Sequence, residues 1–413
     1  MVRVATSTLY QQGLASMNNQ QASLLHVQQQ LGTGRRILTP SDDPVAATRA
    51  LGVAQAQSVN GQYTTTRKQA SATLGMEENT LQSVTTTIQN IQSLLVNAGN
   101  GTMSDTDRAS LATALQGQYD QLMGMANADD GNGNYLFAGL QSSTVPFAKN
   151  SAGAAVYQGD NSHQLLQVDV ARQMESGNNG AEVFMSVTSN AGYVLKGNAA
   201  NTGTATYGPI SVSDPSNPLY GTPLKLTFQT NAVTGNMEYQ VSNATTGAAI
   251  GGAVVYNDGT PISVGGVSFT VKGTPASGDS FTAVPAQQAG ADMFANLQNV
   301  INALKQPIDT GTNQAAAGAN LQNVLATGIR QFSNSLDNVL TVRSSVGSRM
   351  QELDALDTIG QNRDLNNSQT LSNLQDLDYA SAITEYSQRK TALQGAQQSF
   401  MQIQNMNLFQ YLR

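Results

Sequence analysis

The sequence predicts a mainly α-helical protein with an inserted all-β domain, in which both chain termini build one elongated antiparallel helical bundle. Two matching apolar stripes at helical spacing lie at opposite ends of the 413 residues, and further helical stripes flank the middle. Between them the helical period is lost and short strand-like runs follow one another. We expect three parts: residues 1–40 with 365–413 as terminal coiled-coil helices, 41–185 with 281–364 as a helical trunk with a β-hairpin, and 186–280 as an outer β-rich domain.

The N-terminal stretch has apolar residues seven positions apart, which is typical of a supercoiled seam. The seam residues are Tyr10, Met17, Leu24 and Leu31, with Leu14 and Val27 beside them. An ordinary amphipathic helix packed on a globular body is the alternative for either end taken alone. The matching stripe at the other end favours terminal helices that pair.

The C-terminal stretch carries its apolar residues at steps of three and four, which places them on one side of a helix. They are Leu371, Leu374 and Leu377, then Leu393, Ala396, Phe400, Ile403 and Leu408. With no proline or other break expected, one helix from Ser372 to Leu412 would be roughly 60 Å long at 1.5 Å per residue.

The flanks of both stripes are rich in Gln, Asn, Ser and Thr, and no Asp or Glu precedes Asp42. A solvated coiled coil usually carries Glu and Lys at these positions. Uncharged flanks suit helices surrounded by copies of themselves, because buried charge there would be costly.

A connector follows the first helix. Gly32 and Gly34 predict a helix stop, and Pro40 and Pro44 predict an extended segment. Ser41, Asp42 and Asp43 before Pro44 form a helix-start pattern, so we expect a connector and helix cap at residues 40–44. Acid–base catalysis or a cation site is the alternative for the paired aspartates. No third ligand stands nearby in the sequence.

Trunk helices are expected from Val45 to Asn97, where three glycines could bend the chain, and from a cap at Ser104 onward. The acidic, glycine-rich segment 129–133 that follows is interpreted as a turn. It fails the calcium-loop pattern, because Tyr135 and Gln141 stand where that pattern needs glycine and glutamate.

The middle of the chain predicts short strands. The expected strands are at 135–137, 156–157 and 165–170, then at 224–228, 238–241, 253–256 and 267–271. Helix resumes from Asp292 to Lys305, and a longer stripe then runs from Leu321 to Leu353. Helical segments on both sides of the insertion predict one antiparallel bundle.

Composition excludes several classes of function. Only 11% of residues are charged and the net charge is −7, so nucleic-acid binding is not expected. There is no cysteine, and His26 and His163 lie far apart, so we expect no metal, no cofactor and no enzyme. No apolar run is long enough to span a membrane, and the first residues lack a secretory signal. The protein is expected to be cytoplasmic or exported without a cleavable signal peptide.

Three motifs carry a family resemblance. Residues 35–47, Arg-Arg-Ile-Leu-Thr-Pro-Ser-Asp-Asp-Pro-Val-Ala-Ala, and residues 134–139, Asn-Tyr-Leu-Phe-Ala-Gly, are the first two. The third begins at residues 377–384, Leu-Asp-Tyr-Ala-Ser-Ala-Ile-Thr, and continues through 393–396 to 407–412. Together they resemble the flagellin superfamily, and its hook–filament junction branch in particular. Gly395 departs from the alanine common in that family, and the β-insertion shows no resemblance.

The resemblance implies a structural protein of the bacterial flagellum, outside the cell, that joins the hook to the filament as a ring of subunits. Its terminal helices would form an inner tube and its β-domain would face outward. The implied partners are copies of itself, a neighbouring hook-associated protein, flagellin, and an export chaperone on the C-terminal helix. The implied export route is the flagellar type III apparatus.

Three alternatives accompany this interpretation. Filament flagellin is the same class of protein at a different position. The turn-rich β-domain also permits a surface adhesin or glycan-binding protein, and an enzyme inside the insertion is the least favoured. Terminal segments poor in strong helix formers are expected to be disordered in the monomer and to fold on assembly.

Overall fold

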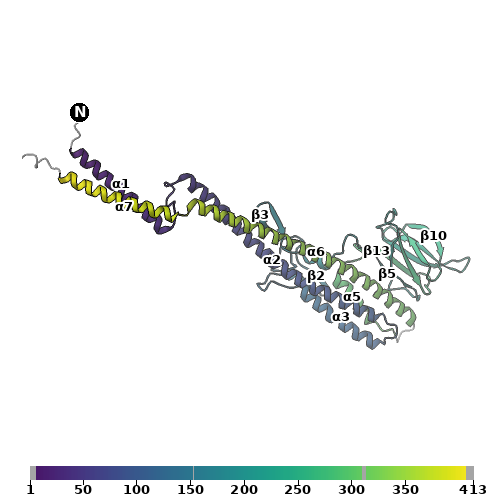
Figure 1. The fold of residues 1–413 in the computed structure, drawn as a ribbon. Coiled ribbons are helices and arrows are strands. Elements are labelled where there is room, and N and C mark those ends of the chain that lie inside the picture. Colours follow the sequence, from purple (N-terminus) through teal and green to yellow (C-terminus); the bar gives the residue numbers. More distant parts are fainter. Residues whose placement is uncertain (1–5, 152, 309–312, 406–413) are drawn as a thin grey trace, which may run out of the picture. The chain divides into compact units, whose positions relative to one another are not determined.

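The computed structural model describes residues 6–151, 153–308 and 313–405 (Figure 1). Its helices are α1 (Thr6–Thr33), α2 (Pro44–Ala98), α3 (Asp105–Ala126), α4 (Gly180–Phe184), α5 (Met293–Leu304), α6 (Gln314–Gln375) and α7 (Tyr379–Asn405). Its strands begin with β1 (Phe147–Lys149), β2 (Ala155–Tyr157), β3 (Leu165–Asp169) and β4 (Arg172–Glu175). The predicted fold class, helices from both chain ends around an inserted all-β region, is confirmed.

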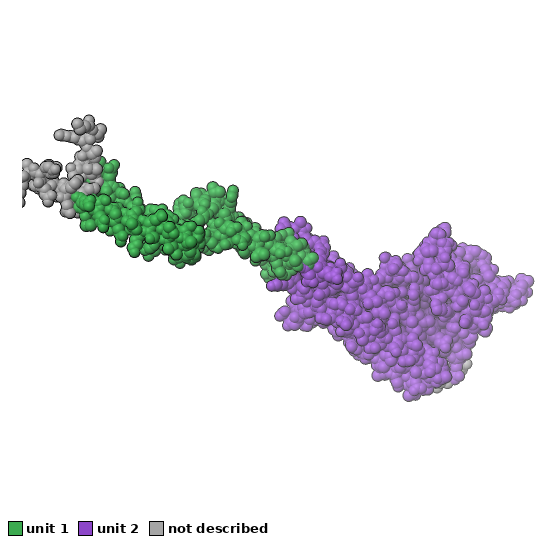
Figure 2. All heavy atoms as spheres, in the orientation of Figure 1, with its two compact units in different colours: residues 1–65, 355–413 green, residues 66–354 purple. Residues whose placement is uncertain are grey.

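The chain forms two compact units, residues 1–65 with 355–413 and residues 66–354 (Figure 2). We call them the terminal unit and the body unit. Helices α2 and α6 contribute residues to both. The predicted division into three functional parts differs from this contact-based division and stays a prediction.

In the terminal unit, α1 and α7 lie side by side and run antiparallel (Figure 1). The predicted single helix from Ser372 to Leu412 is wrong, because α6 ends at Gln375 and α7 begins at Tyr379. Leu371 and Leu374 therefore belong to α6, and Leu377 lies in the break.

The break in the C-terminal helix is held by the connector that follows α1. The Arg36 amide donates to the Gln375 carbonyl at 2.7 Å, and the Leu377 amide donates to the Gly34 carbonyl at 3.0 Å. The Arg36 guanidinium also donates to the Leu374 carbonyl at 2.9 Å. These bonds satisfy carbonyl and amide groups that a helix end leaves without partners. We call this arrangement, residues 34–36 against 374–377, the paired break.

The body unit has a helical core in which the predicted stripes are buried. Leu74, Leu81, Val84, Ile88, Ile91 and Leu95 of α2 are fully buried, and so are Leu115 and Leu122 of α3. Ser104 and Asp107 form a capping box at the start of α3, and Asp292 caps α5. The glycines of α2 leave the helix unbroken from Pro44 to Ala98.

The segment after α3 departs from its prediction in one place. Residues 135–137 are not a strand; Tyr135 makes an isolated bridge to Asp129 and a turn follows. The turn at 129–133 is stabilised by the Asp130 carboxylate, which accepts the amides of Asn132 and Asn134 at 2.8 and 3.0 Å. This carboxylate is thus used locally, as the turn interpretation predicts.

The inserted β-region contains two antiparallel sheets. Its strands are β5 (Tyr193–Gly197), β6 (Thr206–Tyr207), β7 (Ser211–Val212), β8 (Leu224–Thr230), β9 (Met237–Asn243), β10 (Ala249–Val255), β11 (Pro261–Val264), β12 (Val267–Lys272) and β13 (Ser280–Pro285). One sheet has the order β10-β9-β8-β13-β5, and β12 pairs with β11, β6 and β7 in the other. Both sheets contribute to one core around Phe228, Phe269 and Phe281.

A row of polar α6 side chains holds the β-region in the body unit. Asn323 donates to the Ala205 carbonyl at 3.0 Å and accepts the Tyr207 amide at 3.2 Å. Thr327 donates to the Leu195 carbonyl at 2.9 Å. Asn323 is 2% exposed, so these bonds satisfy groups that would otherwise be buried without partners. The β-region is therefore fixed to α6 through hydrogen bonds to its backbone.

Candidate subunit-packing site

The candidate site is the surface of the α1–α7 pair, where the sequence places its apolar stripes. Near the free end of the pair, the rings of Tyr10 and Phe400 have centroids 5.1 Å apart. A Cβ added to Gly13 would lie 3.2 Å from a ring carbon of Phe400, so glycine allows this close approach.

The predicted packing residues do not share one environment. Met17, Leu24 and Leu31 of α1 are half-buried, as are Leu393, Ala396 and Phe400 of α7. Tyr10 and Leu14 remain 43% and 39% exposed. Ile403 lies in α7, but the structure does not describe its side chain, and Leu408 lies outside the described residues.

The most deeply buried apolar positions of the pair include one that the sequence interpretation missed. Val27, noted beside the heptad positions, is 3% exposed, and Ala382 is 4% exposed. Counting from Leu393 toward the N-terminus in steps of four, three and four residues leads through Arg389 and Tyr386 to Ala382. Following the period through these polar residues would have found it.

Large apolar side chains also lie outside the contact between α1 and α7. Leu25 is 51% exposed, and Tyr379, Ile383 and Met401 are 53%, 58% and 55% exposed. We call these four residues the outer apolar set. Tyr379 and Ile383 are about one helical turn apart on α7, and neighbouring exposed apolar side chains of this kind can mark an interaction site. One α1–α7 pair therefore leaves apolar surface for further helices to cover.

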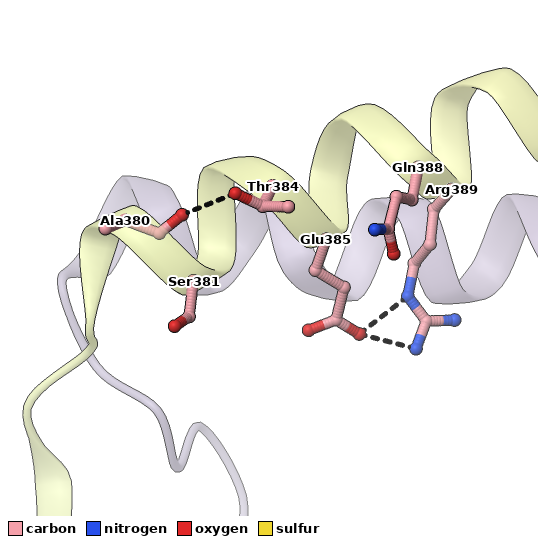
Figure 3. Close-up of a pocket in the computed structure, with 6 residues that line it drawn as sticks. All are labelled: Ala380, Ser381, Thr384, Glu385, Gln388 and Arg389. Carbon is pink, nitrogen blue, oxygen red and sulfur yellow. Dashed lines mark hydrogen bonds and ion pairs between the residues drawn. The ribbon is translucent and has the colours of Figure 1, made fainter.

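A shallow hollow lies on the outer side of α7 near its start (Figure 3). Its lining comes from one helix: Ala380, Ser381, Thr384, Glu385, Gln388 and Arg389. The Arg389 guanidinium donates to Glu385 at 2.6 Å, so the two charges neutralise each other. A nearly charge-neutral groove along one helix can receive a neighbouring helix.

The residues of the predicted connector and cap have separate tasks. Asp43 is the cap, and its carboxylate accepts the Ala46 amide at 3.0 Å next to Pro44, the first residue of α2. The Asp42 carboxylate accepts the amides of Thr39 and Leu38 at 2.8 and 2.9 Å, and these bonds lower its pKa to about 2.

The rest of the connector is also locally bonded. The Ser41 hydroxyl lies 2.8 Å from that of Thr39, and the exposed Pro40 stands between these two residues. His26 contacts Asp42 at 3.2 Å, which ties α1 to the connector. Among the described residues, no group of three potential metal ligands comes together. The hydrogen bonds of Asp42 and Asp43 to backbone amides give this acidic segment its local role in capping.

Membrane insertion finds no support in the helices. In the part of the chain that the structure describes, none combines the length and hydropathy that a membrane span requires.

Comparison with known proteins connects these helices to a family. Residues 4–142 match the bacterial flagellin N-terminal helical region, and residues 329–412 match the bacterial flagellin C-terminal helical region. Flagellar hook-associated protein 3 of Salmonella typhimurium is 34% identical over 416 residues, covering 100% of both chains. The chain belongs to the flagellar hook-associated protein 3 family.

Other members agree in sequence and in fold. Flagellar hook-associated protein 3 of Escherichia coli is 33% identical over 410 residues and covers 99% of each chain. The crystal structure of the Legionella pneumophila hook-associated protein 3 has a TM-score of 0.69 at 27% identity, covering 78% of this chain and 98% of that one. FlgL of Xanthomonas campestris has a TM-score of 0.67 at 26% identity, covering 77% and 99%.

Membership confirms the resemblance that the three motifs indicated. The chain is a structural component of the bacterial flagellum, and its full-length relatives are hook-associated proteins rather than filament flagellins. Those relatives are structural flagellar proteins, in keeping with the packing surface described above.

Proposed function

We propose that this protein joins the flagellar hook to the flagellin filament as a ring of axial subunits. The outer apolar set on the α1–α7 pair supports this proposal most directly, because each of these side chains is more than half exposed in the described terminal unit. Each fully buried Leu, Ile or Met side chain contributes roughly 1.5–3 kcal/mol. Neighbouring copies, an adjacent hook-associated protein and flagellin would supply that cover.

The proposal assigns a task to each predicted part. Residues 1–40 with 365–413 form an inner tube, residues 41–185 with 281–364 pack laterally as the trunk, and residues 186–280 face outward. The amide-rich flanks of α1 favour this arrangement, since they can be enclosed by other helices without burying charge.

Export and location form part of the same proposal, which here rests on the family. We propose that the chain leaves the cell through the flagellar type III apparatus and acts outside the cell. A cytoplasmic chaperone would cover the α7 stripe beforehand, because its apolar residues lack their final partners until assembly. The protein has no enzymatic activity in this proposal, and it needs no cofactor.

Coupled folding would control the time of assembly. The α1–α7 pair is a two-helix structure with half-buried contacts, and such a pair is marginal in water. We expect residues 1–35 and 372–413 of the free monomer to be cleaved by protease well before the body unit. Equal resistance of both regions would contradict this expectation.

The packing surface itself can be tested with Phe400→Asp. This change should abolish filament growth in cells, because it places a charge where Tyr10 and Gly13 meet the ring. Gln398→Asp, at an exposed position of the same helix, is the matched control and should preserve growth. Normal filaments from Phe400→Asp, or a lowered unfolding temperature of its body unit, would refute the proposed role of α7.

A further inference from the structure

The β-region has exposed apolar side chains at one edge of its larger sheet. Val233, in the β8–β9 hairpin, is 95% exposed, and Val254 and Val255 at the end of β10 are 49% and 44% exposed. Successive strand residues face opposite sides of a sheet, and Val255 lies on the same side as Glu238. We call Val233 and Val255 the tip patch. Glu238 stands at its border, paired with Val255 across the sheet. It is the only charged residue between Phe228 and Tyr256.

The hairpin that carries Val233 is held in shape by Asn231. Its side-chain oxygen accepts the amides of Val233 and Thr234 at 2.9 and 3.0 Å. Its side-chain nitrogen donates to Glu238 at 2.7 Å. An exposed apolar side chain on a preorganised turn loses little conformational freedom on binding.

A complementary hollow lies at the opposite edge of the same sheet. A groove of about 390 Å³ runs between β5, the segment after β6 and α6, and it is mainly apolar. Leu195, Pro209, Ile210 and Ile329 line it, with Arg330 and Ser333 at its polar side. The Arg330 Nε donates to the Tyr193 carbonyl at 3.3 Å, and within the described ranges no carboxylate forms an ion pair with this guanidinium.

The sheet order prevents the tip patch from filling the groove of its own chain. In the order β10-β9-β8-β13-β5, four strand spacings of about 4.8 Å separate the two edges, or about 19 Å (Figure 1). The two surfaces lie at opposite edges of one sheet whose β5 side is fixed to α6. Complementary patches at opposite sides of one molecule form head-to-tail contacts, which give a ring when the rotation between copies closes and an open helical array when it does not.

We propose that the tip patch of one copy docks into the β5–α6 groove of the next copy. The valines enter the apolar groove, and Glu238 of one copy faces Arg330 of its neighbour. Apolar surface and opposite charge are thus matched on both sides of the contact. This contact rests on the proposed ring of subunits and gives the outward-facing β-region a part in holding that ring together.

The native chain has no cysteine, so introduced thiols provide a specific test. We would place Val233→Cys and Ser333→Cys in one chain and treat isolated flagella with a short bis-maleimide. The expected result is a ladder of dimers and larger multimers. The matched control replaces Val233→Cys by Val170→Cys, a valine 71% exposed beside β3, and should stay monomeric.

Each other outcome would overturn the contact. A double variant that is present in flagella yet stays monomeric would exclude head-to-tail docking while leaving the proposed junction role intact. Absence of the protein from flagella would count against both proposals. A dimer from Val233→Cys alone would indicate a symmetric contact between two tips, and a ladder of equal yield in the control would show that the cross-linking is unspecific.

The charge contact has its own readout. Glu238→Lys in the double-cysteine chain should lower the yield of the ladder, and adding Arg330→Glu should restore it. An unchanged yield in Glu238→Lys, or no restoration in the reversed pair, would refute the assigned pairing of these two side chains.

Discussion

Gly34 is the position where a single methyl group should open the paired break. Its φ is +69°, and a Cβ there would lie 2.8 Å from the Tyr379 hydroxyl oxygen. Holding an alanine in the left-handed region costs about 1–2 kcal/mol. The Tyr379 hydroxyl can move aside because it lies at the end of a flexible side chain. Most of the cost therefore comes from the left-handed backbone conformation of the alanine. Gly34→Ala should therefore weaken the paired break by about 1–2 kcal/mol.

Amide hydrogen exchange of Arg36 and Leu377 in assembled flagella, where the α1–α7 pair is expected to be folded, measures this directly, because both amides donate across the paired break. A loss of one or two kcal/mol predicts roughly 5–30-fold faster exchange. Gly32→Ala is the matched control, since Gly32 lies within α1 and an added Cβ meets nothing within 4 Å. That variant should slow exchange slightly through higher helix propensity. Unchanged exchange in Gly34→Ala, or the same acceleration in both variants, would refute the reasoning.

Three further predictions concern the body unit. Asn323→Ala removes the side-chain bonds to Ala205 and Tyr207 and should lower the free energy of unfolding by about 1–3 kcal/mol in urea titrations, whereas the exposed neighbour Gln322→Ala should change little. Burial raises the pKa of Glu77 to about 8 from a usual value of 4.5. Between these two pH values the folded chain keeps a proton that the unfolded chain loses. The free energy of unfolding should therefore fall as the pH rises from 4.5 to 8. Glu77→Gln should flatten this fall in thermal melts, and an unchanged slope would contradict the assignment. Gly75→Ala should stabilise α2 by up to about 1 kcal/mol, because a Cβ there has open space, and a lower melting temperature would show that Gly75 is needed for another reason.

The candidate site was predictable in its location more than in its geometry. Met17, Leu24 and Leu31, chosen by heptad spacing, are half-buried in α1, and their role in packing between subunits stays a prediction. Heptad spacing does not show that Leu14 stays 39% exposed. The spacing identifies which side of the helix is apolar, but not how much of that side the partner helix covers. The extent of this cover depends on the partner helix, which comes from the other end of the chain.

Local chemistry fixed much of this protein before any tertiary contact was known. Helical periodicity identified α2, α3, α5 and the core of α6, and the caps at Ser104 and Asp292 act through residues two or three positions away. Strand patterning likewise located β8, β9 and β12. These features depend on near neighbours in the chain, so the sequence alone determines them.

Tertiary structure decided the features that join distant segments. Residues 375–379 contain neither glycine nor proline. Asp378 caps the start of α7 locally, and the end of α6 is bonded through its backbone to the connector after α1. Asn323 and Thr327 look like ordinary polar helix positions, and only the arriving β-region makes them buried hydrogen-bonding groups. In both cases the partner lies more than 100 residues away, and a local pattern carries no information about which distant backbone will meet it.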